Sequence, residues 1–369
     1  MKRIAIITNI PAPYRVDLFY YLQKNTKEYE IHIFYASQNE DNRKWKVEEG
    51  KMENSHFLKS STIKIPSRYD TKYIHISKGI KKALRELKPA IVIGSEYNPT
   101  AVQALQYCRK EKIPYISWTD GTLHSERNMN RIQKFLRRYV IRHASACLSS
   151  STKSKEAQLV YGAREESCFT SLLTIDIEKY MVQAENRQRG RILCVGSLIE
   201  RKGIDLLLKA LQGIGEDYTL ALAGEGPEKE NIRELSRKLG IEEHVEFLGY
   251  LSQEELKKEY ARSSLFVLPT REDCYALVIL EAMCAALPVV ASQYAGGAYD
   301  LIEDGKSGYI VDPYDAEKLC GCLQELLQNP GLAEEMGRNS LERVGQFCFE
   351  RVSEGFWNAF AYVSENGLR

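Results

Sequence analysis

Two adjacent cations, Arg201 and Lys202, occupy a position that suits the binding of a phosphate group. They follow the apolar run Ile192–Val195, which has the composition of a buried strand, and they precede a helical pattern. Gly196 permits a tight turn between the two elements. Where a strand ends and a helix begins, free backbone amides and positive side chains converge on an anion. The pattern predicts an anion site, with a plain basic surface as the alternative.

Two carboxylates, Asp273 and Glu281, surround the start of a helix predicted over Leu277–Cys284. Carboxylates are almost never buried without a partner, and Glu281 stands in an apolar segment, so we expect a cation or a ligand hydroxyl to satisfy it. Asp273 lies in the loop that delivers the chain to the same helix. We therefore expect both carboxylates to face one pocket, where paired acceptors suit ribose or hexose hydroxyls. Gly224, in a further strand-to-helix turn, has a simple structural connection as its alternative role.

The elements that must position these groups alternate between strand and helix, which predicts parallel sheets covered by helices on both faces. The polar segment Gln183–Gly190 interrupts this alternation and predicts a linker, giving domains over residues 1–185 and 186–369. A final helix over Glu350–Val363 carries an apolar packing face. Predicted strands are Arg3–Thr8, Ile31–Tyr35, Ala90–Gly94, Tyr115–Trp118, Ala146–Ser149, Ile192–Val195, Thr219–Ala223, Val245–Leu248, Leu265–Leu268 and Pro288–Ala291.

Composition excludes several classes of protein. The 369 residues are 44% hydrophobic and 27% charged, as in a soluble globular chain, and no apolar run is long enough to span a membrane. The nine cysteines are an odd number scattered along the chain, which predicts free thiols in a reducing, cytoplasmic compartment. Cys320 and Cys322 lack a second ligand pair at zinc spacing, so we expect no metal site.

Charge is divided unevenly along the chain. Residues 1–185 hold 31 Lys and Arg against 20 Asp and Glu, whereas the remainder holds 20 against 30. The split predicts an anionic partner for the first half, with a solvated basic surface as the alternative. The segment Arg131–His143 alternates basic and apolar residues at helical spacing and fits an anionic membrane surface. Its alternative is a helix packed by Ile132, Phe135, Leu136, Tyr139 and Val140 with solvated arginines opposite. No recognition motif accompanies the charge, so nucleic acid is not expected as a partner.

Five segments of the second half, in order, resemble family 4 of the retaining glycosyltransferases. They are G-S-L-I-E-R-K-G (196–203), G-E-G-P (224–227), F-L-G-Y (247–250), D-C-Y-A-L-V-I-L-E-A-M-C-A-A-L-P-V-V-A-S (273–292) and G-K-S-G-Y-I-V-D-P (305–313). The opening N-I-P-A-P-Y-R-V-D-L-F (9–19) resembles a subgroup that builds bacterial surface polysaccharides. The resemblance implies the GT-B fold, in which two Rossmann-like α/β domains face each other across a cleft. It also implies a C-terminal helix that crosses back to the first domain.

The resemblance also implies roles for individual residues. In the catalytic group, Lys202 and Arg201 contact the donor diphosphate, Asp273 contacts the donor sugar, and Asp120 stands where many members have a histidine. Glu281 holds the nucleotide ribose, and Tyr250 lies beside the base. The remaining donor-side residues are Gly196, Ser197, Gly224, Ala276 and Leu277, and the acceptor-side residues are Arg15, Tyr14 and His124.

Four positions depart from the family pattern. Asp273 replaces a glutamate that is longer by one methylene, and Ser197 replaces an arginine for which Arg201 compensates. Ala276 replaces a common glycine. The family histidine appears as Asp120, with His124 four residues further on, and the sequence leaves open which of the two takes its role.

The resemblance implies a retaining, metal-independent hexosyltransferase with no cofactor. It moves a hexose-type sugar from a UDP- or GDP-linked donor to a saccharide or lipid-linked saccharide acceptor, in polysaccharide or glycolipid biosynthesis at the inner membrane face. The 1–185 domain binds the acceptor, and the 186–369 domain binds the nucleotide sugar. The alternatives are a non-catalytic sugar-nucleotide-binding subunit and a GT-B sugar-nucleotide epimerase.

Overall fold

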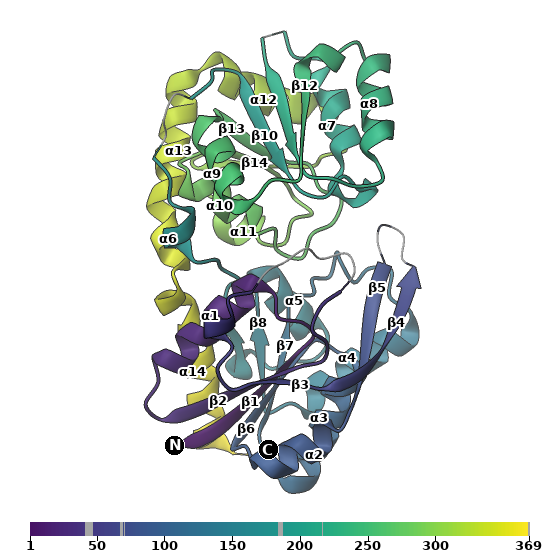
Figure 1. The fold of residues 1–369 in the computed structure, drawn as a ribbon, viewed down its shortest axis with the longest axis vertical. Helices are drawn as coiled ribbons and strands as arrows, with labels where there is room; N and C mark the ends of the chain where they lie inside the picture. The colour runs from purple at the N-terminus through teal and green to yellow at the C-terminus, as the bar shows by residue number, and fades with distance from the viewer. Residues whose placement is uncertain (41–46, 67–68, 70, 184–186, 216, 368–369) are drawn as a thin grey trace. The chain divides into compact units, whose positions relative to one another are not determined.

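A computed structural model describes residues 1–40, 47–66, 69, 71–183, 187–215 and 217–367. The chain forms two compact units, one of Met1–Ile175 with Phe349–Arg369 and one of Asp176–Cys348 (Figure 1). The boundary predicted at 185/186 falls at residues 184–186, outside the described residues, and the observed division comes earlier. The end of the predicted linker belongs to the second unit, because Arg187 donates to the carbonyls of Ala285 and Ala286 at 2.6 and 2.8 Å.

The first unit is built on a parallel sheet of seven strands in the order β3-β2-β1-β6-β7-β8-β9. Each pair in this sheet is parallel, so every connection crosses over one face, and the helices that make these crossings cover the sheet. The strands are β1 (Lys2–Thr8), β2 (Tyr29–Tyr35), β3 (Ser55–Phe57), β6 (Ile91–Ser95), β7 (Tyr115–Thr119), β8 (Ala146–Ser149) and β9 (Cys168–Thr170). The helices are α1 (Pro13–Lys24), α2 (Ile80–Leu87), α3 (Pro99–Glu111), α4 (Arg131–His143), α5 (Thr152–Val160) and α14 (Phe349–Asn366).

Strand β1 shows how the sheet divides the core of this unit into two layers. Ile4 and Ile6 point into the cluster that contains α1 and α14, whereas Ala5 and Ile7 point into the cluster that contains α2 and α3. This alternation follows from the period of two residues in a strand. A continuous apolar strand is therefore buried on both faces, as expected for a parallel sheet.

The C-terminal helix α14 packs on the first unit, as the family resemblance implies, against α1, β8 and β9. Its buried face includes Val352, Phe356 and Phe360, while Trp357 is partly buried. Phe356 meets the indole of Trp118 edge to face, with ring centroids 5.3 Å apart. The terminal segment that the sequence assigns to the second domain thus completes the core of the first. Figure 1 shows this helix in yellow beside the purple α1.

The second unit has a parallel sheet of six strands in the order β12-β11-β10-β13-β14-β15. Its strands are β10 (Arg191–Val195), β11 (Thr219–Ala223), β12 (Val245–Gly249), β13 (Leu265–Leu268), β14 (Val289–Ser292) and β15 (Gly308–Val311). Its helices are α6 (Ile177–Tyr180), α7 (Ile204–Leu211), α8 (Lys229–Lys238), α9 (Gln253–Arg262), α10 (Val278–Cys284), α11 (Ala298–Leu301), α12 (Ala316–Gln328) and α13 (Pro330–Val344). Ser252 and Glu255 form a reciprocal capping box that fixes the start of α9.

Two features of the first unit differ from the sequence expectations. The hairpin of β4 (Lys59–Pro66) and β5 (Thr71–Lys78) is a separate antiparallel sheet that the sequence does not predict. Helix α4 has the predicted bounds, but two members of the alternative packing set, Ile132 and Phe135, are 78% and 68% exposed. Val140 is buried and Leu136 and Tyr139 are partly buried, as that set predicts, and Ile141 is buried as well.

Candidate functional site

The glycine turns of the second unit lie where β10 and β11 end. Gly196 has a φ of 153° and Gly224 a φ of 148°, which L side chains rarely adopt. A Cβ on Gly224 would lie 1.9 Å from the carbonyl oxygen of Gly196. The two turns also bond to each other, since the Leu198 amide donates to the carbonyl of Glu225 at 2.9 Å. The residues expected on the donor side at positions 196, 197 and 224 are therefore brought together by backbone contact.

A cluster of two cations and one carboxylate lies beside these turns. The Lys202 ammonium donates to Asp273 Oδ2 at 2.7 Å, and Arg201 Nη1 lies 3.5 Å from the same oxygen. Burial acts to raise the pKa of Asp273, but the charges of Lys202 and Arg201 outweigh it and lower the pKa to about 2. The sequence predicts both cations and the carboxylate separately, and the structure brings all three together. Asp273 thus remains an anion at neutral pH, and the cluster has a surplus of positive charge.

Backbone bonds hold the two halves of this cluster in register. The carbonyl of Arg201 accepts from the Arg271 amide at 2.8 Å and from Thr270 Oγ1 at 3.0 Å. The Asp273 amide in turn donates to the carbonyl of Tyr294 at 3.0 Å. Arg271 makes two bonds of 2.7 Å to the carboxylate of Asp205 in α7. Sequence reasoning misses Thr270, Arg271 and Asp205, because residues about 70 positions apart contact one another only in the folded sheet.

Glu281 in α10 has a different partner from the one the sequence predicts. Its carboxylate accepts from the hydroxyl of Tyr260 in α9 at 2.9 Å, so neither a cation nor a ligand hydroxyl is needed to satisfy it. Burial raises the pKa of Glu281 to about 7, against the opposing effect of the Tyr260 hydrogen bond. Asp273 and Glu281 therefore have separate partners and opposite pKa shifts. Asp273 precedes α10, whose N-cap is Leu277, and Glu281 lies in the first turn of this helix.

Two further residues on the donor side have contrasting surroundings. Ala276 is buried and has a φ of 73°, so it takes the left-handed conformation that favours glycine. This explains physically why the departure from glycine matters, because a side chain in this region costs roughly 1–2 kcal/mol. Tyr250 directly follows β12 and is 59% exposed.

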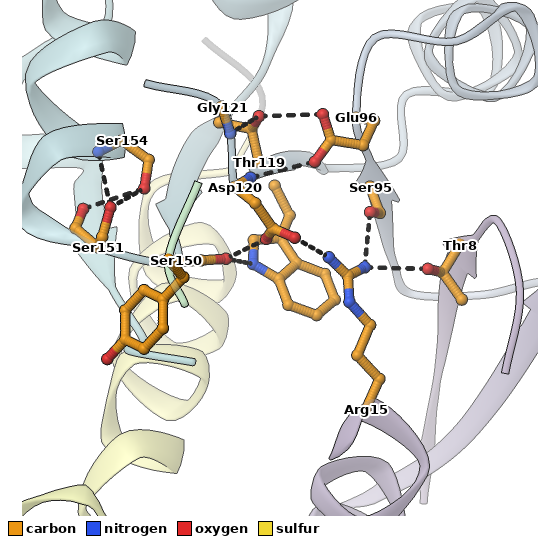
Figure 2. A network of polar contacts seen from close by, with 12 residues as sticks. Thr8, Arg15, Ser95, Glu96, Thr119, Asp120, Gly121, Ser150, Ser151 and Ser154 are labelled. Carbon is orange, nitrogen blue, oxygen red and sulfur yellow. Dashed lines mark hydrogen bonds and ion pairs between the residues drawn. The ribbon is translucent and has the colours of Figure 1, made fainter. Parts of the chain in front are cut away.

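A second polar network lies at the carboxyl ends of the strands in the first unit, and Figure 2 shows it from close by. Arg15 in α1 donates to Thr8 at 3.0 Å, to Ser95 at 2.9 Å and to Asp120 at 2.5 Å. Its guanidinium lies 4.4 Å from the ring centroid of Trp118. Burial acts to lower the pKa of Arg15, but Asp120 outweighs it and the pKa is raised. Arg15 and Asp120, expected on the acceptor side and in the catalytic group, are partners of one another.

The other oxygen of Asp120 accepts from Ser150 at 2.5 Å, and the indole of Trp118 donates to the same serine at 2.9 Å. Glu96 accepts from the backbone amide of Asp120 at 3.0 Å and from Thr119 Oγ1 at 3.2 Å. Burial first, and then the charge of Asp120, raises the pKa of Glu96 to about 7. Glu96 also has a φ of 64°, a conformation that non-glycine residues rarely adopt. Sequence reasoning misses Thr8, Ser95, Glu96 and Ser150, although each is the last residue of a strand or directly follows one.

The two remaining acceptor-side residues are Tyr14 and His124. Tyr14 is in the first turn of α1, next to Arg15. His124 lies in the loop between β7 and α4, and both side chains are partly buried. Among the residues that the structure describes, no group of three or more His, Cys, Asp and Glu side chains is arranged to hold a metal ion. In the same described part of the chain, no helix is long and apolar enough to cross a membrane.

Comparison with known families gives a match in each unit. Residues 12–151 match a model described as "Glycosyl transferase 4-like", and residues 176–343 match one described as "Glycosyl transferases group 1". A GDP-mannose-dependent alpha-(1-6)-phosphatidylinositol monomannoside mannosyltransferase of Mycolicibacterium smegmatis is 31% identical over 183 residues, covering 44% of this chain and 48% of that protein. The match therefore spans about half the length of this relative. An alpha-D-kanosaminyltransferase of Streptomyces kanamyceticus is 29% identical, covering 61% of this chain and 62% of that protein.

Solved structures agree in fold along nearly the whole chain. The Anabaena protein HepE, solved in complex with UDP, has a TM-score of 0.78 at 17% identity and covers 98% of this chain and 100% of its own. Identity this low shows the fold alone. Three observations point to the same fold. Each unit has a parallel sheet covered by helices, glycine turns and cations lie at strand ends, and each unit matches one glycosyltransferase model. The chain has the GT-B fold, and each of its two units matches a glycosyltransferase family model.

Proposed function

We propose that the chain transfers a hexose-type sugar, with retention of configuration and without a metal ion, from a nucleoside-diphosphate sugar to a saccharide acceptor. The observation that carries the proposal is the cluster of Lys202, Arg201 and Asp273 beside the glycine turns. In the difficult step the glycosyl–phosphate bond breaks and negative charge grows on the departing diphosphate. Two fixed cations against one carboxylate leave positive charge available to stabilise that growth. The chain's own cations thus supply the positive charge that a bound divalent ion supplies in metal-dependent enzymes.

Asp273 has two roles in this proposal. Because its pKa is about 2, it stays ionised and holds the Lys202 ammonium in place. It also keeps a free lone pair for a hydroxyl of the donor sugar, as its position in the family pattern implies. Glu281 accepts hydrogen bonds from the ribose hydroxyls, which requires its carboxylate form. The N-terminal turn of α10 around Leu277 lies near the diphosphate, and Tyr250 lies beside the base.

The acceptor is assigned to the first unit, and we propose that it is lipid-linked and held at an anionic membrane surface. Helix α4 supports this assignment. Ile132 and Phe135 are exposed, as are Arg131, Arg138 and Arg142. On a helical wheel these positions share one face, which is suited to a bilayer interface that is both apolar and anionic. The mycobacterial relative is itself named for a phosphatidylinositol-based lipid.

The proposal is tested first by thermal shift of the purified chain with UDP, GDP, ADP and CMP, each with and without Mg²⁺. A ligand that binds the folded state alone raises the melting temperature according to RT ln(1 + [L]/Kd). We expect one uridine or guanosine diphosphate to raise it, equally in both metal conditions. No shift with any nucleotide would contradict the donor assignment.

Turnover then separates the proposal from its alternatives. Product with a glycosidic bond to an added saccharide, formed with retention, supports the transferase. Nucleotide binding without turnover on any acceptor would favour a non-catalytic binding subunit. A changed sugar nucleotide formed without acceptor would indicate an epimerase.

A further inference from the structure

The hairpin of β4 and β5 stands apart from the parallel sheet of the first unit. Its strands pair antiparallel along their length, from Lys59 opposite Lys78 to Ile63 opposite Ile74 and beyond. A two-stranded sheet is marginally stable in water unless one face packs on something else. The two faces of this hairpin can be separated because residues that lie directly opposite one another share a face, and neighbours along a strand alternate.

One face of the hairpin packs on the body of the first unit. His75 is 1% exposed and its Nε2 lies 3.0 Å from Glu40, while its Nδ1 lies 2.9 Å from Thr62 Oγ1. The Ser77 amide donates to Thr100 in α3 at 3.1 Å. The packing requirement of the hairpin is therefore met by this face, and the opposite face is available for another role.

The opposite face carries four isoleucines, at positions 63, 65, 74 and 76. Ile63 and Ile65 are 48% and 43% exposed, and Ile74 and Ile76 are partly exposed. Single exposed apolar residues are ordinary, but a group of β-branched residues on one face of a sheet is a typical interaction surface. We call these four residues the isoleucine face.

Positive charge surrounds the isoleucine face. Lys59 and Lys78 lie directly opposite each other at its base, on the same side as the isoleucines, and both are exposed. Like charges directly opposite in a sheet are destabilising unless a counter-charge offsets them. Residues 59–78, which contain the hairpin, hold five Lys and Arg and a single acid, Asp70. A surface that joins apolar side chains to unbalanced cations is complementary to a partner with an apolar interior and an anionic exterior.

We infer that the isoleucine face docks on an anionic lipid bilayer, with the isoleucines entering the boundary between headgroups and acyl chains. The inference rests on the proposed function in one respect, the membrane-held acceptor, and adds a second contact to that of α4. Lys59 and Lys78 reach the headgroup phosphates with their ammonium groups while their methylene stems stay on the apolar surface. A second copy of this chain is a poorer occupant, because it would bring the same cations to the interface.

The hairpin and α4 belong to the same side of the first unit. Helix α3 packs against both β5 and α4. Figure 1 shows β4, β5 and α4 together on the flank of this unit that lies away from α14. Two separate apolar and basic elements on one flank strengthen binding to a continuous surface, because the second contact forms at a high effective concentration.

The test measures co-sedimentation of the full chain with vesicles of phosphatidylglycerol and phosphatidylcholine, and with vesicles of phosphatidylcholine alone. The double variant Ile63→Thr/Ile65→Thr keeps β-branching but places hydroxyls on the face, and Ile63→Val/Ile65→Val is its apolar control. We expect the Thr variant to bind anionic vesicles about tenfold more weakly and the Val control to bind nearly as the native chain does. Lys59→Gln/Lys78→Gln is expected to weaken binding severalfold and to reduce its salt dependence. Since all these side chains are exposed, melting temperatures should be unchanged.

Each outcome separates the inference from the proposed function. Equal binding of the Thr variant and the native chain would overturn the inference, as would equal binding to neutral vesicles. A concentration-dependent dimer that the Thr variant abolishes would overturn it in favour of a self-interface. Loss of vesicle binding in Ile132→Ser/Phe135→Ser alone, with the hairpin variants unaffected, would leave the α4 contact standing and overturn the hairpin contact. The nucleotide-induced thermal shift, measured without vesicles, reports on the donor site separately and should be the same in every variant.

Discussion

Each unit of the molecule carries a cation–aspartate pair at the carboxyl end of a parallel sheet, and the two pairs differ in what surrounds them. Lys202 lies 2.7 Å from Asp273 in the second unit, and Arg15 lies 2.5 Å from Asp120 in the first. All four side chains are less than one-fifth exposed. Strand ends collect polar residues in both sheets because the last residue of a buried strand is the first that can turn toward solvent or ligand.

The first-unit pair has most of its hydrogen-bonding positions filled by its neighbours, and we call it the saturated pair. Arg15 bonds to Thr8 and Ser95 as well as Asp120, and its planar face lies on Trp118. Asp120 uses its remaining oxygen on Ser150. Three of the five guanidinium donors of Arg15 and both oxygens of Asp120 have partners within the chain, so the network's main effect is to fix the strand ends relative to α1.

The second-unit pair is left unsaturated. Among the residues that the structure describes, the Lys202 ammonium has Asp273 as its one hydrogen-bond partner, and a second cation, Arg201, stands 3.5 Å from the same oxygen. The turns beside this pair are formed by glycines, which have no side chains to bond to the ammonium. An ammonium has three donors, so two remain for an anionic ligand. An ion pair at a strand end is therefore structural where the protein itself fills its hydrogen-bonding positions, and functional where positions remain for a ligand.

The largest expected effect is loss of stability in the saturated pair. Asp120→Ala leaves the Arg15 charge without its counter-charge in a buried network, which should cost about 3 kcal/mol of unfolding free energy. Arg15→Met should cost a similar amount, and the double variant should cost clearly less than the sum of the two. Urea denaturation of the three variants measures this coupling. A stable Asp120→Ala protein that has lost turnover would instead assign Asp120 to the reacting groups and break the comparison.

The next effect is loss of turnover in the unsaturated cluster. Lys202→Ala removes a donor aimed at the departing diphosphate and should lower kcat by about 10²–10³. The fold should persist because Arg201 still faces Asp273. Lys209→Ala is the matched control, since Lys209 is an exposed cation in the neighbouring α7 that pairs weakly with Asp205. Near-native turnover in a folded Lys202→Ala protein would contradict the proposed role.

Glu281 gives a smaller, pH-dependent effect. Its folded pKa of about 7 lies above the unfolded value of about 4.3, so its contribution to stability is complete below about pH 4 and is lost as pH rises through 7. Glu281→Gln should therefore be the more stable protein at pH 8, by on the order of 1 kcal/mol after allowance for its partial exposure. Thermal unfolding across this pH range, with Tyr260→Phe as a second variant, measures it.

The ionisation of Glu281 should also make the affinity for nucleotide depend on pH. Ribose hydroxyls stabilise the ionised form, so the nucleotide should bind roughly tenfold more tightly at pH 8 than at pH 6. Glu281→Gln should remove that dependence. If the native chain bound the nucleotide equally across this range, Glu281 would not be the ribose acceptor.

Local sequence patterns predict the elements of both sheets well and their long-range contacts poorly. The bounds of α4, β11 and β13 agree with prediction because each has a clear apolar period and a turn or capping signal beside it. The β4–β5 hairpin is missed because its strands are polar on one face and lie between lysines. Its isoleucine pattern becomes visible only once the register is known.

For the candidate site, too, local residue types are predicted well and long-range contacts are predicted poorly. Residue types at Lys202, Asp273 and Glu281 are enough to predict an anion and hydroxyl site. Nothing local indicates that Tyr260 satisfies Glu281 or that Arg15 pairs with Asp120, because these contacts join residues 21 and 105 positions apart. Sequence spacing therefore predicts which ionisable and hydrogen-bonding groups are present. Contacts in three dimensions decide how many of these groups are already bonded within the protein and how many remain for a ligand.

The smallest effect concerns the backbone that carries the unsaturated cluster. Ala276 and Ala286 flank α10, and both have left-handed φ values, 73° and 51°. Replacement of either by glycine relieves that strain but frees the unfolded chain, so each variant should gain only about 0.5 kcal/mol of stability. Ala276 lies between Asp273 and the first turn of α10, so Ala276→Gly should also loosen the loop that holds the carboxylate against Lys202 and weaken nucleotide binding severalfold. Ala286→Gly, matched in strain but beyond the far end of the helix, should leave binding unchanged. Equal binding by the two variants would mean that the loop is held by its bonds to Arg201 and Tyr294 rather than by the strained residue.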